Sequence, residues 1–423
     1  MKVLVVGGGG REHALAWKIK QSSAVTRLFA APGNAGIASI AECVEIAAED
    51  IMMLTRFIKR EKIDLTVVGP EGPLVAGLVD HLQKEGKRAF GPAARAAELE
   101  GSKVFAKRIM KMHGIPNAEF RTFDSFEAAL GEVESREGRV VIKADGLAAG
   151  KGVYVCKSLP EARQALSETM LEKRYGEAGA HVVVEEILEG EEASILAFTD
   201  GKNIYPLETC QDHKAIFDGD KGPNTGGMGA YCPAPVVTSK IYDTIERKIL
   251  IPIVHAMNVE DRPYQGVIYA GLMINGPDVF VLEFNCRFGD PETQPLMVRL
   301  KSDLVEVIEA VIDRKLDKVE LVWDPRPAIC VVMASSGYPG SYPKGLPIAG
   351  IDAAAADPDV KVFHAGTTLK DGKFVTAGGR VLGVTALGGN LAAAKKKAYE
   401  AVSKIHFEGA HYRKDIADKA LGR

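Results

Sequence analysis

Long apolar runs, an excess of basic charge and closely spaced cysteines are all missing from this sequence of 423 residues. No apolar stretch reaches the roughly 18 residues that a membrane-spanning helix needs, and the first run, Met1–Val6, stops at Gly7, too soon for a signal-peptide core. The formal net charge is −3, and no stripe of lysine and arginine suggests a nucleic-acid surface. We therefore expect a cytoplasmic protein that binds neither a membrane nor nucleic acid.

The six cysteines are scattered along the chain, and no two of them have the spacing of a metal site or a redox motif. Because no targeting segment indicates an oxidising compartment, we expect free thiols that serve as packing residues. Apolar residues make up 46% and charged residues 26% of the chain, the balance of a globular protein with a sizeable core. The length predicts about three domains.

The first hundred residues alternate between strand and helix patterns, which predicts a parallel sheet with helices on its faces. The expected strands are Lys2–Val6, Val25–Ala30 and Asp64–Val68, and the expected helices are Arg11–Gln21 and Glu49–Lys62. A turn rich in glycine or proline follows each strand, at residues 7–10, 32–36 and 69–73. Ligands of such sheets bind beyond the carboxyl ends of the strands, so these turns predict a binding rim.

Beyond residue 120 the pattern becomes β-rich. Strands at Arg139–Ala144 and Gly152–Cys156 flank a glycine loop, and with a helix at Leu159–Lys173 they suggest a small α+β lid. Residues 211–235 are expected to form a long polar loop, and the Asn275-Gly276 pair predicts a hairpin between Gly266–Ile274 and Val279–Asn285. The last ninety residues indicate a separate β-rich domain that ends in a helix at Leu391–Ile405.

The first glycine loop, Gly7–Gly10, follows a strand and opens a helix, as a dinucleotide-binding fingerprint requires. However, Glu12 stands where the third glycine of that fingerprint would fall, and no acidic residue ends the second strand. A helix N-terminus can still hold a monophosphate through its N–H groups. The alternative is a tight strand–helix turn without a ligand.

The second glycine loop, Lys143–Val153, is not a P-loop. Gly152 follows Lys151 where a Ser or Thr would bind magnesium, and a strand follows instead of a helix. Such a loop between two strands can fold over a nucleotide triphosphate, with Lys143 reaching the phosphates. An ordinary hairpin with surface lysines is the alternative, although it does not explain so many glycines and lysines together.

The segment Leu282–Glu292 carries the sharpest pattern. Because strand side chains alternate, Glu283, Asn285 and Arg287 should share one face, and Leu282, Phe284 and Cys286 should share the other, buried face. A carboxylate and an amide oxygen two residues apart are hard ligands that suit Mg²⁺, and a nearby arginine can clamp a carboxylate or phosphoryl group. A polar strand face in solvent is the alternative.

Two further segments, Gln211–Lys214 and Gly222–Tyr231, combine charged residues with small ones. Backbone N–H groups and small residues suit a loop that closes on an anionic substrate. His213 on its own is more often a structural histidine, but its place between Asp212 and Lys214 favours a position at the site.

Taken together, these motifs resemble those of the phosphoribosylamine–glycine ligases. That family has a GGREHA-like start, then PGNAG, GPE-x-PL, KADGLAAGKGV, EE-x-L-x-G-E-E-x-S, QDHK, GPNTGGMGAY, EFN-x-RFGDPE and FHAGT. In this chain they stand in that order at Gly9–Ala14, Pro32–Gly36, Gly69–Leu74, Lys143–Val153, Glu185–Ser194, Gln211–Lys214, Gly222–Tyr231, Glu283–Glu292 and Phe363–Thr367. The set spans nearly the whole chain, so the resemblance is specific.

The resemblance implies a multidomain α/β and α+β chain with an ATP-grasp fold. Its N-terminal Rossmann-like domain with a parallel sheet would cover residues 1–101 and bind the phosphoribosyl group. The ATP-grasp domain would cover residues 102–326, with a lid at 122–190 and a central part at 191–326. A β-rich C-terminal domain would cover residues 327–423.

The resemblance also implies site residues. ATP would be bound by Lys103, Lys143, Gly146, Gly150, Lys151, Gly152, Glu185, Glu186, Leu188 and Glu192. Glu283 and Asn285 would hold Mg²⁺ or Mn²⁺. The substrates would contact Gly9, Gly10, Arg11, Glu12, Asn34, Pro70, Glu71, His213, Asn224, Thr225, Gly226, Gly227 and Arg287. The residues expected to act in catalysis are Arg287, Lys143, Asp212 and Lys214.

The implied reaction joins glycine to 5-phosphoribosylamine in purine synthesis, with ATP as co-substrate and glycyl phosphate as intermediate, in a protein expected to be a monomer. Two positions depart from the family pattern. Ala215 stands where many members have Arg, which leaves a basic role there in doubt, and Gly72 stands where many have Ala. The competing hypotheses are another ATP-grasp ligase of purine synthesis, a nicotinamide-dependent dehydrogenase, and a nucleotide-binding protein without catalysis.

Overall fold

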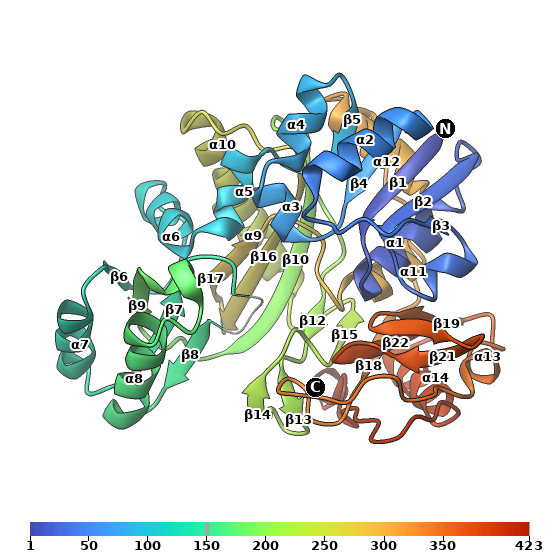
Figure 1. Cartoon of the computed structure of the whole chain (residues 1–423). Helices are drawn as coiled ribbons and strands as arrows, with labels where there is room; N and C mark the ends of the chain where they lie inside the picture. The colour runs from blue at the N-terminus through green and yellow to red at the C-terminus, as the bar shows by residue number, and fades with distance from the viewer. Residues whose placement is uncertain (149–151, 423) are drawn as a thin grey trace.

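The computed structural model describes residues 1–148 and 152–422. Figure 1 shows an N-terminal part at the top, a small lobe at the left and a C-terminal part at the lower right, with long central strands between them. Within the described residues, no helix is both long enough and apolar enough to cross a membrane. All six cysteines are free thiols, as expected from their spacing.

The N-terminal part is a five-stranded sheet with the order β3-β2-β1-β4-β5, and every neighbouring pair is parallel. Its elements are β1 (Lys2–Gly7), α1 (Gly10–Ile19), β2 (Arg27–Pro32), β3 (Glu42–Cys43), α2 (Ile51–Glu61), β4 (Leu65–Val68), α3 (Glu71–Val75), α4 (Leu78–Lys84), β5 (Arg88–Phe90) and α5 (Ala94–Gly101). Residues Val3–Val6 of β1 are fully buried because helices cover both faces of a parallel sheet. The predicted parallel sheet is confirmed.

The lobe at the left of Figure 1 is an antiparallel sheet of four strands with the order β6-β9-β7-β8. Its elements are β6 (Phe120–Phe123), α7 (Phe126–Ser135), β7 (Val140–Ala144), β8 (Val153–Cys156), α8 (Leu159–Leu166) and β9 (Val182–Glu185). It has its own apolar core, in which Val140, Ile142 and Val184 are fully buried. The predicted helix 159–173 ends earlier, because a π-helical turn at Ser167–Leu171 follows α8.

The central sheet has the order β11-β10-β16-β17. Its strands are β10 (Glu191–Thr199), β11 (Ile204–Pro206), β16 (Gly266–Asn275) and β17 (Asp278–Asn285), so the hairpin predicted from Asn275-Gly276 is confirmed. The helices in this part are α6 (Lys103–Met112), α9 (Ser239–Ile245) and α10 (Ile251–Val259). Ser102 begins α6 as an N-cap, since its hydroxyl oxygen accepts the N–H of Phe105 at 3.0 Å.

The expectation of a long polar loop at residues 211–235 is wrong. This segment forms β12 (Gln211–Asp212), β13 (Ala215–Phe217), β14 (Lys221–Asn224) and β15 (Gly229–Cys232). The reason is tertiary: β15 pairs with β18, about a hundred residues later in the chain, and its four residues are buried. Local glycine and proline content cannot reveal a strand partner that is so distant in sequence.

The C-terminal sheet therefore has the order β12-β15-β18-β22-β19. Its other strands are β18 (Ala328–Ala334), β19 (Val360–His364) and β22 (Arg380–Leu387), while β20 (Thr367–Lys370) and β21 (Lys373–Thr376) form a separate two-stranded sheet. The helices of this part of the chain are α11 (Thr293–Arg299), α12 (Leu304–Ile312), α13 (Ile351–Ala354), α14 (Leu391–Val402) and α15 (Asp418–Leu421). Because β12 and β15 belong to this sheet, the C-terminal part is tied to the segment that carries Asp212.

The N-terminal and C-terminal parts meet at a buried pair of histidines. The backbone N–H of His364 donates to Nδ1 of His13 at 2.8 Å, and the side-chain amide of Asn34 donates to the carbonyl of His364 at 2.8 Å. Burial lowers the pKa of His13 to about 3, with a further contribution from nearby His364, and lowers the pKa of His364 to about 4. Both rings are therefore neutral in the folded protein at pH 7.

We expect the unfolding free energy to fall as the pH drops below about 6.5, the ordinary histidine pKa. Between pH 6.5 and about 4, the unfolded chain binds protons at both histidines while the folded chain does not. Above pH 6.5, neither the folded nor the unfolded chain protonates them. Each histidine contributes roughly 1.4 kcal/mol per pH unit in this window.

Urea unfolding at pH 7 and pH 5 measures the effect. His364→Gln should reduce the decrease by about 2 kcal/mol, whereas His406→Gln, at an exposed position, should leave it unchanged. An unaltered pH dependence in His364→Gln would contradict the assignment.

Candidate active site

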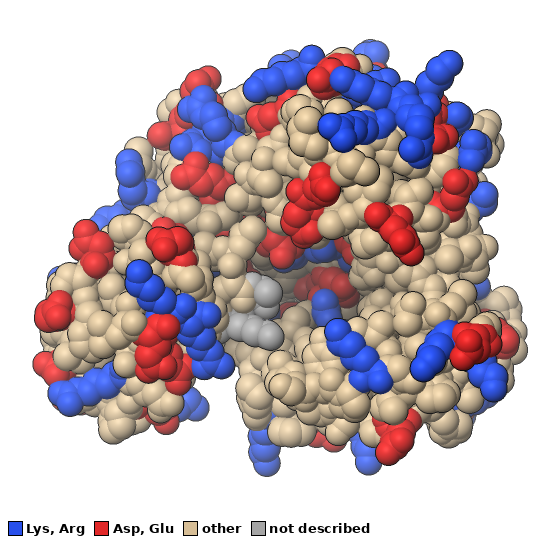
Figure 2. All heavy atoms as spheres, viewed as in Figure 1, with Lys and Arg blue, Asp and Glu red and all other residues tan. Residues whose placement is uncertain are grey.

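A cavity of about 520 Å³ lies between the lid, the central sheet and the C-terminal sheet. Figure 2 shows it as a deep hollow with acidic and basic side chains at its floor. The predicted site residues in its lining are Arg11, Glu71, Lys103, Lys143, Gly146, Gly152, Glu185, Glu186, Leu188, Glu192, Asp212, Lys214, Asn224, Thr225, Gly226, Glu283, Asn285 and Arg287. The fold thus brings most of the predicted residues together.

The lining also contains residues that sequence reasoning missed, notably Glu100, Tyr269, Asp290, Glu292 and Arg380. Glu292 and Asp290 belong to the Glu283–Glu292 motif, but only Glu283, Asn285 and Arg287 had been selected from it. Nine carboxylates line the cavity against six cationic side chains, so its charge is acidic overall. An acidic lining of this kind favours ligands that bring positive charge with them.

At the lid end, Glu185 lies between two lysines. Its carboxylate oxygens are 3.1 Å from Nζ of Lys107 and 3.1 Å from Nζ of Lys143. Lys143 also donates to the carbonyl of Leu282 at 2.9 Å, which joins the lid strand β7 to the central strand β17. Burial lowers the pKa of Lys107 to about 8, although Glu185 counteracts this effect. Sequence reasoning missed Lys107, whose only signal was the amphipathic pattern of its helix.

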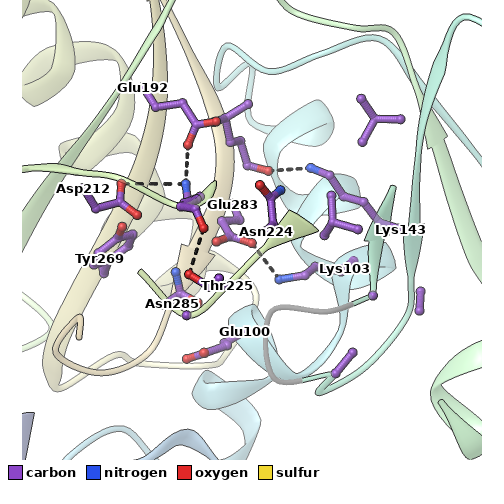
Figure 3. Close-up of a pocket in the computed structure, with 18 of the residues that line it drawn as sticks. Glu100, Lys103, Lys143, Glu192, Asp212, Asn224, Thr225, Tyr269, Glu283 and Asn285 are labelled. Carbon is purple, nitrogen blue, oxygen red and sulfur yellow. Dashed lines mark hydrogen bonds and ion pairs between the residues drawn. The ribbon is translucent and has the colours of Figure 1, made fainter. Parts of the chain in front are cut away.

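Glu283 and Asn285 lie on one face of β17 and open into the cavity (Figure 3). Nζ of Lys103 is 3.2 Å from Oε2 of Glu283, and this lysine is the main reason why the pKa of Glu283 lies far below its usual range. The two side chains therefore offer an ionised carboxylate and an amide oxygen, which fits a hard divalent cation. Among the described residues, no group of three or more His, Cys, Asp or Glu could hold a metal. Such a cation would need further oxygens from phosphate and water.

The predicted alternation along 282–287 is confirmed for Phe284 and Cys286, which are buried, but it is wrong for Leu282. Leu282 lines the cavity. The pairing of β16 with β17 shifts between Gly271 and Leu272, so that Gly271 faces Glu283 and Leu272 faces Val281. This β-bulge inserts one residue into β17 and breaks the alternation at Leu282.

Two residues beyond Asn285, Arg287 lies between two carboxylates. It is 3.1 Å from Glu71 and 2.9 Å from Glu100. Burial alone would raise the pKa of Glu71, but Arg287 and Arg11 bring it down to about 2. Arg11 in turn contacts Glu12 at 2.6 Å and donates to the carbonyl of Phe288 at 3.0 Å. Arg287 is therefore held in a fixed orientation, with its charge compensated before any substrate binds.

The N-terminus of α1 already has carboxylate partners. The N–H of Gly9 donates to Glu12 at 2.6 Å, and that of Arg11 lies 3.4 Å from Asp290. Gly9, Gly10, Glu12, Asn34 and Pro70 do not belong to the cavity lining. Their role in substrate binding stays a prediction.

The C-terminal sheet contributes Arg380 to the site. Its Nη1 donates to the carbonyl of Gly226 at 2.6 Å and to that of Asp290 at 2.7 Å, and its Nη2 lies 3.2 Å from the Asp290 carboxylate. The hydroxyl of Thr225 donates to the carbonyl of Lys214 at 2.8 Å. The Asn224–Gly226 wall of the cavity is thus held from both sides. Nothing in the local sequence around Arg380 indicated this contact.

Lys214, Glu192 and Asp212 form a second charged group (Figure 3). Lys214 is ion-paired with Glu192, and its Nζ lies 3.9 Å from Oδ1 of Asp212. Burial is the main reason why the pKa of Asp212 rises to about 7; Lys214 lowers it and Glu292 raises it again. The Tyr269 hydroxyl donates to Glu292 at 2.8 Å. This corner of the cavity combines two buried carboxylates with few cations.

Two other predicted residues, His213 and Gly227, are not part of this lining. Gly150 and Lys151 lie outside the described residues. His213 is only 1% exposed, packs against Tyr231 and does not reach the cavity; burial lowers its pKa to about 4. Gly227 is also absent from the lining, next to Gly226, which is part of it.

Family models match almost the entire chain. The N domain of phosphoribosylglycinamide synthetase matches residues 1–100, its ATP-grasp (A) domain residues 101–293, and its C domain residues 328–419.

Individual proteins match over a similar length. A phosphoribosylamine–glycine ligase of Rhodopirellula baltica is 54% identical over 426 residues, covering 99% of this chain and 98% of that protein. The crystal structure of a phosphoribosylamine–glycine ligase from Thermotoga maritima is similar with a TM-score of 0.86 at 34% identity, covering 99% of this chain and 100% of that one. The biotin carboxylase domain of a Hydrogenobacter thermophilus 2-oxoglutarate carboxylase has a TM-score of 0.74 at 14% identity, covering 97% of this chain and 91% of that one; it shares the fold.

Proposed function

The chain belongs to the phosphoribosylglycinamide synthetase family, and from this premise we propose how its cavity joins glycine to 5-phosphoribosylamine. It is an ATP-dependent carbon–nitrogen ligase of purine biosynthesis. One observation carries the proposed mechanism: a single cavity is lined by Lys103 and Lys143, the Glu283–Asn285 pair, and Arg11 and Arg287. ATP, the activated glycine and phosphoribosylamine can therefore react within one cavity.

The lid end suits ATP. Val155, Leu188 and Met273 give this end an apolar lining for the adenine ring, next to the Glu185–Leu188 stretch that we propose as the hinge. Lys103 and Lys143 would neutralise phosphate oxygens, and Glu192 would reach the ribose. Gly146 and Gly152 would cover the phosphates from the lid. Phosphoryl transfer needs mainly this kind of positioning and charge neutralisation.

We propose that Glu283 and Asn285 hold Mg²⁺ or Mn²⁺ together with oxygens of ATP. The ionised carboxylate, the amide oxygen and the position of both in the cavity support this assignment. When bound, the cation would offset the negative charge of the phosphates. Lys103, which contacts Glu283 at 3.2 Å, would then be available to the transferred phosphoryl group.

The reaction proceeds in two steps. A carboxylate oxygen of glycine attacks the γ-phosphorus of ATP, the bond to ADP breaks, and glycyl phosphate forms. The amine of phosphoribosylamine then attacks the glycyl carbonyl carbon, phosphate leaves, and the nitrogen gives up a proton. We propose that Arg287 and the Asn224–Gly226 wall hold the acyl phosphate, with Asp212 and Lys214 beside it. A closed lid would keep water from the intermediate.

Phosphoribosylamine would enter from the N-terminal side, where Arg11 and Glu71 line the cavity. It would also contact Gly9, Gly10, Glu12, Asn34 and Pro70 there. His213 and Gly227, which do not line the cavity, would support the Asn224–Gly226 wall from behind. We further propose the three domains at residues 1–101, 102–326 and 327–423, and a cytoplasmic monomer as the working form.

ADP formation with each component left out in turn tests this function. We expect ADP only when ATP, divalent metal, glycine and freshly generated phosphoribosylamine are all present. Equal ADP release without glycine would exclude this reaction and point to another carboxylate–amine ligase. ATP binding without any turnover would indicate a non-catalytic nucleotide-binding protein.

A further inference from the structure

Two buried carboxylates of the cavity are paired less closely with cations than the others: Asp212 has only Lys214 at 3.9 Å, and Glu292 has no ion-pair partner among the described residues. Glu71 and Glu100 pair with Arg287, Glu185 with Lys143, Glu283 with Lys103, and Asp290 with Arg380. Glu192 pairs with Lys214. Among the lining residues that the structure describes, this leaves Asp212, Glu186 and Glu292. Glu186 lies at the hinge, where it accepts the backbone N–H of Glu119 at 2.8 Å.

Asp212 is 8% exposed, and its Oδ1 accepts no hydrogen bond from any described residue. The nearest cation, Nζ of Lys214, is 3.9 Å away and is already ion-paired with Glu192. A buried carboxylate oxygen without a hydrogen bond is costly to maintain, so it indicates a ligand that donates to it. Because Asp212 lines the cavity, that ligand can be a substrate.

Glu292 is 3% exposed and, like Asp212 and Tyr269, lines the cavity. Its Oε1 accepts the Tyr269 hydroxyl at 2.8 Å and lies 3.5 Å from the hydroxyl of Ser194, and no described residue forms an ion pair with it. Figure 3 shows Asp212 and Tyr269 at the same edge of the site. Two carboxylates and one phenol thus give this corner of the cavity a negative charge. It is not a metal site of clustered side chains, because no group of three or more His, Cys, Asp or Glu in the described chain could hold a metal.

We propose that Asp212 and Glu292 bind the ammonium group of glycine. This inference rests on the proposed function, in which the glycine carboxylate is the reacting end. The ammonium nitrogen takes no part in either step, so the protein can hold this end of glycine while the carboxylate end reacts. Two carboxylates provide both the hydrogen-bond acceptors and the negative charge that keep it protonated. The pair would also reject acids that lack the ammonium group.

The substitutions Asp212→Asn and Glu292→Gln test the pair, because each removes a charge and keeps the shape. Gln at 292 can still accept the Tyr269 hydroxyl. Glycolate, in which a hydroxyl replaces the ammonium group, serves as the comparison substrate for ADP release. We expect each variant to lower kcat/KM for glycine roughly tenfold relative to that for glycolate, since a charge-assisted hydrogen bond is lost. The KM for ATP should hardly change.

Asp243→Asn, an exposed acid-to-amide change on α9, is the matched control and should keep the preference for glycine. Thermal unfolding and ATP binding of each variant show that the fold is intact. If both variants lost activity equally with glycine and glycolate, or kept the wild-type preference, the ammonium site would be wrong. If the wild-type enzyme released ADP without any need for glycine, the proposed function itself would fail.

Discussion

Glu283→Gln is expected to lower kcat by roughly 10²–10³-fold, the loss that follows when one stabiliser of the transition state is removed. The glutamine keeps the shape and one oxygen, but it has no charge to hold a divalent cation or to pair with Lys103, now 3.2 Å away. The native carboxylate is ionised because Lys103, Lys214 and Lys143 hold its pKa far below the usual range, so protonation does not already mimic the variant at neutral pH. Initial rates over a range of Mg²⁺ concentrations measure the effect.

The control for this substitution lies on the same strand. Asp278→Asn changes an acid to an amide at the exposed start of β17 and should leave turnover unchanged. The fold should tolerate Glu283→Gln as well, because the side chain faces the cavity and the apolar side of the strand is formed by Phe284 and Cys286. Near-normal turnover of Glu283→Gln at low Mg²⁺ would refute the metal assignment.

The parts of the fold that sequence reasoning predicted well are those with a local cause. β1, β2 and β4 follow from mainly apolar stretches between turns, and the β16–β17 hairpin follows from Asn275-Gly276. In each case the chemistry that sets the structure lies within a few residues. The Glu283–Asn285 pair belongs to the same class, since strand alternation placed both side chains on one face.

The predictions that were wrong or missing concern residues whose structure depends on partners far away in the sequence. The segment 211–235 becomes strands because β18 pairs with β15 and because the tail of the chain holds the β13–β14 hairpin, where fully buried Arg413 contacts Asp220 at 2.9 Å. Leu282 enters the cavity because of a bulge in a pairing that cannot be seen in one strand alone. Arg380 reaches Gly226 across 154 residues. Such contacts come from tertiary packing, so a single sequence gives no signal for them.

Lys143→Met is expected to weaken ATP binding roughly 100-fold, because charge-assisted hydrogen bonds to the phosphates are lost while the length of the side chain is kept. Glu185, the present partner of Lys143, keeps Lys107 at 3.1 Å, so the buried carboxylate stays paired and the fold should survive. Calorimetric titration with ATP measures the change. Lys157→Met, at an exposed position in the same lid, is the control and should bind ATP as the wild-type protein does.

A comparison of Lys143→Met with Lys107→Met separates a direct role of Lys143 from an indirect one. Both lysines contact Glu185 at the same distance, but only Lys143 lines the large cavity. If Lys143 acts only by neutralising Glu185, the two variants should weaken ATP binding equally. If it contacts the phosphates, Lys143→Met should weaken ATP binding far more, while Lys107→Met should mainly lower the unfolding temperature. Binding of ribose 5-phosphate should change in neither variant, since the N-terminal rim lies at the other end of the cavity; a larger loss there than for ATP would place Lys143 in the wrong subsite.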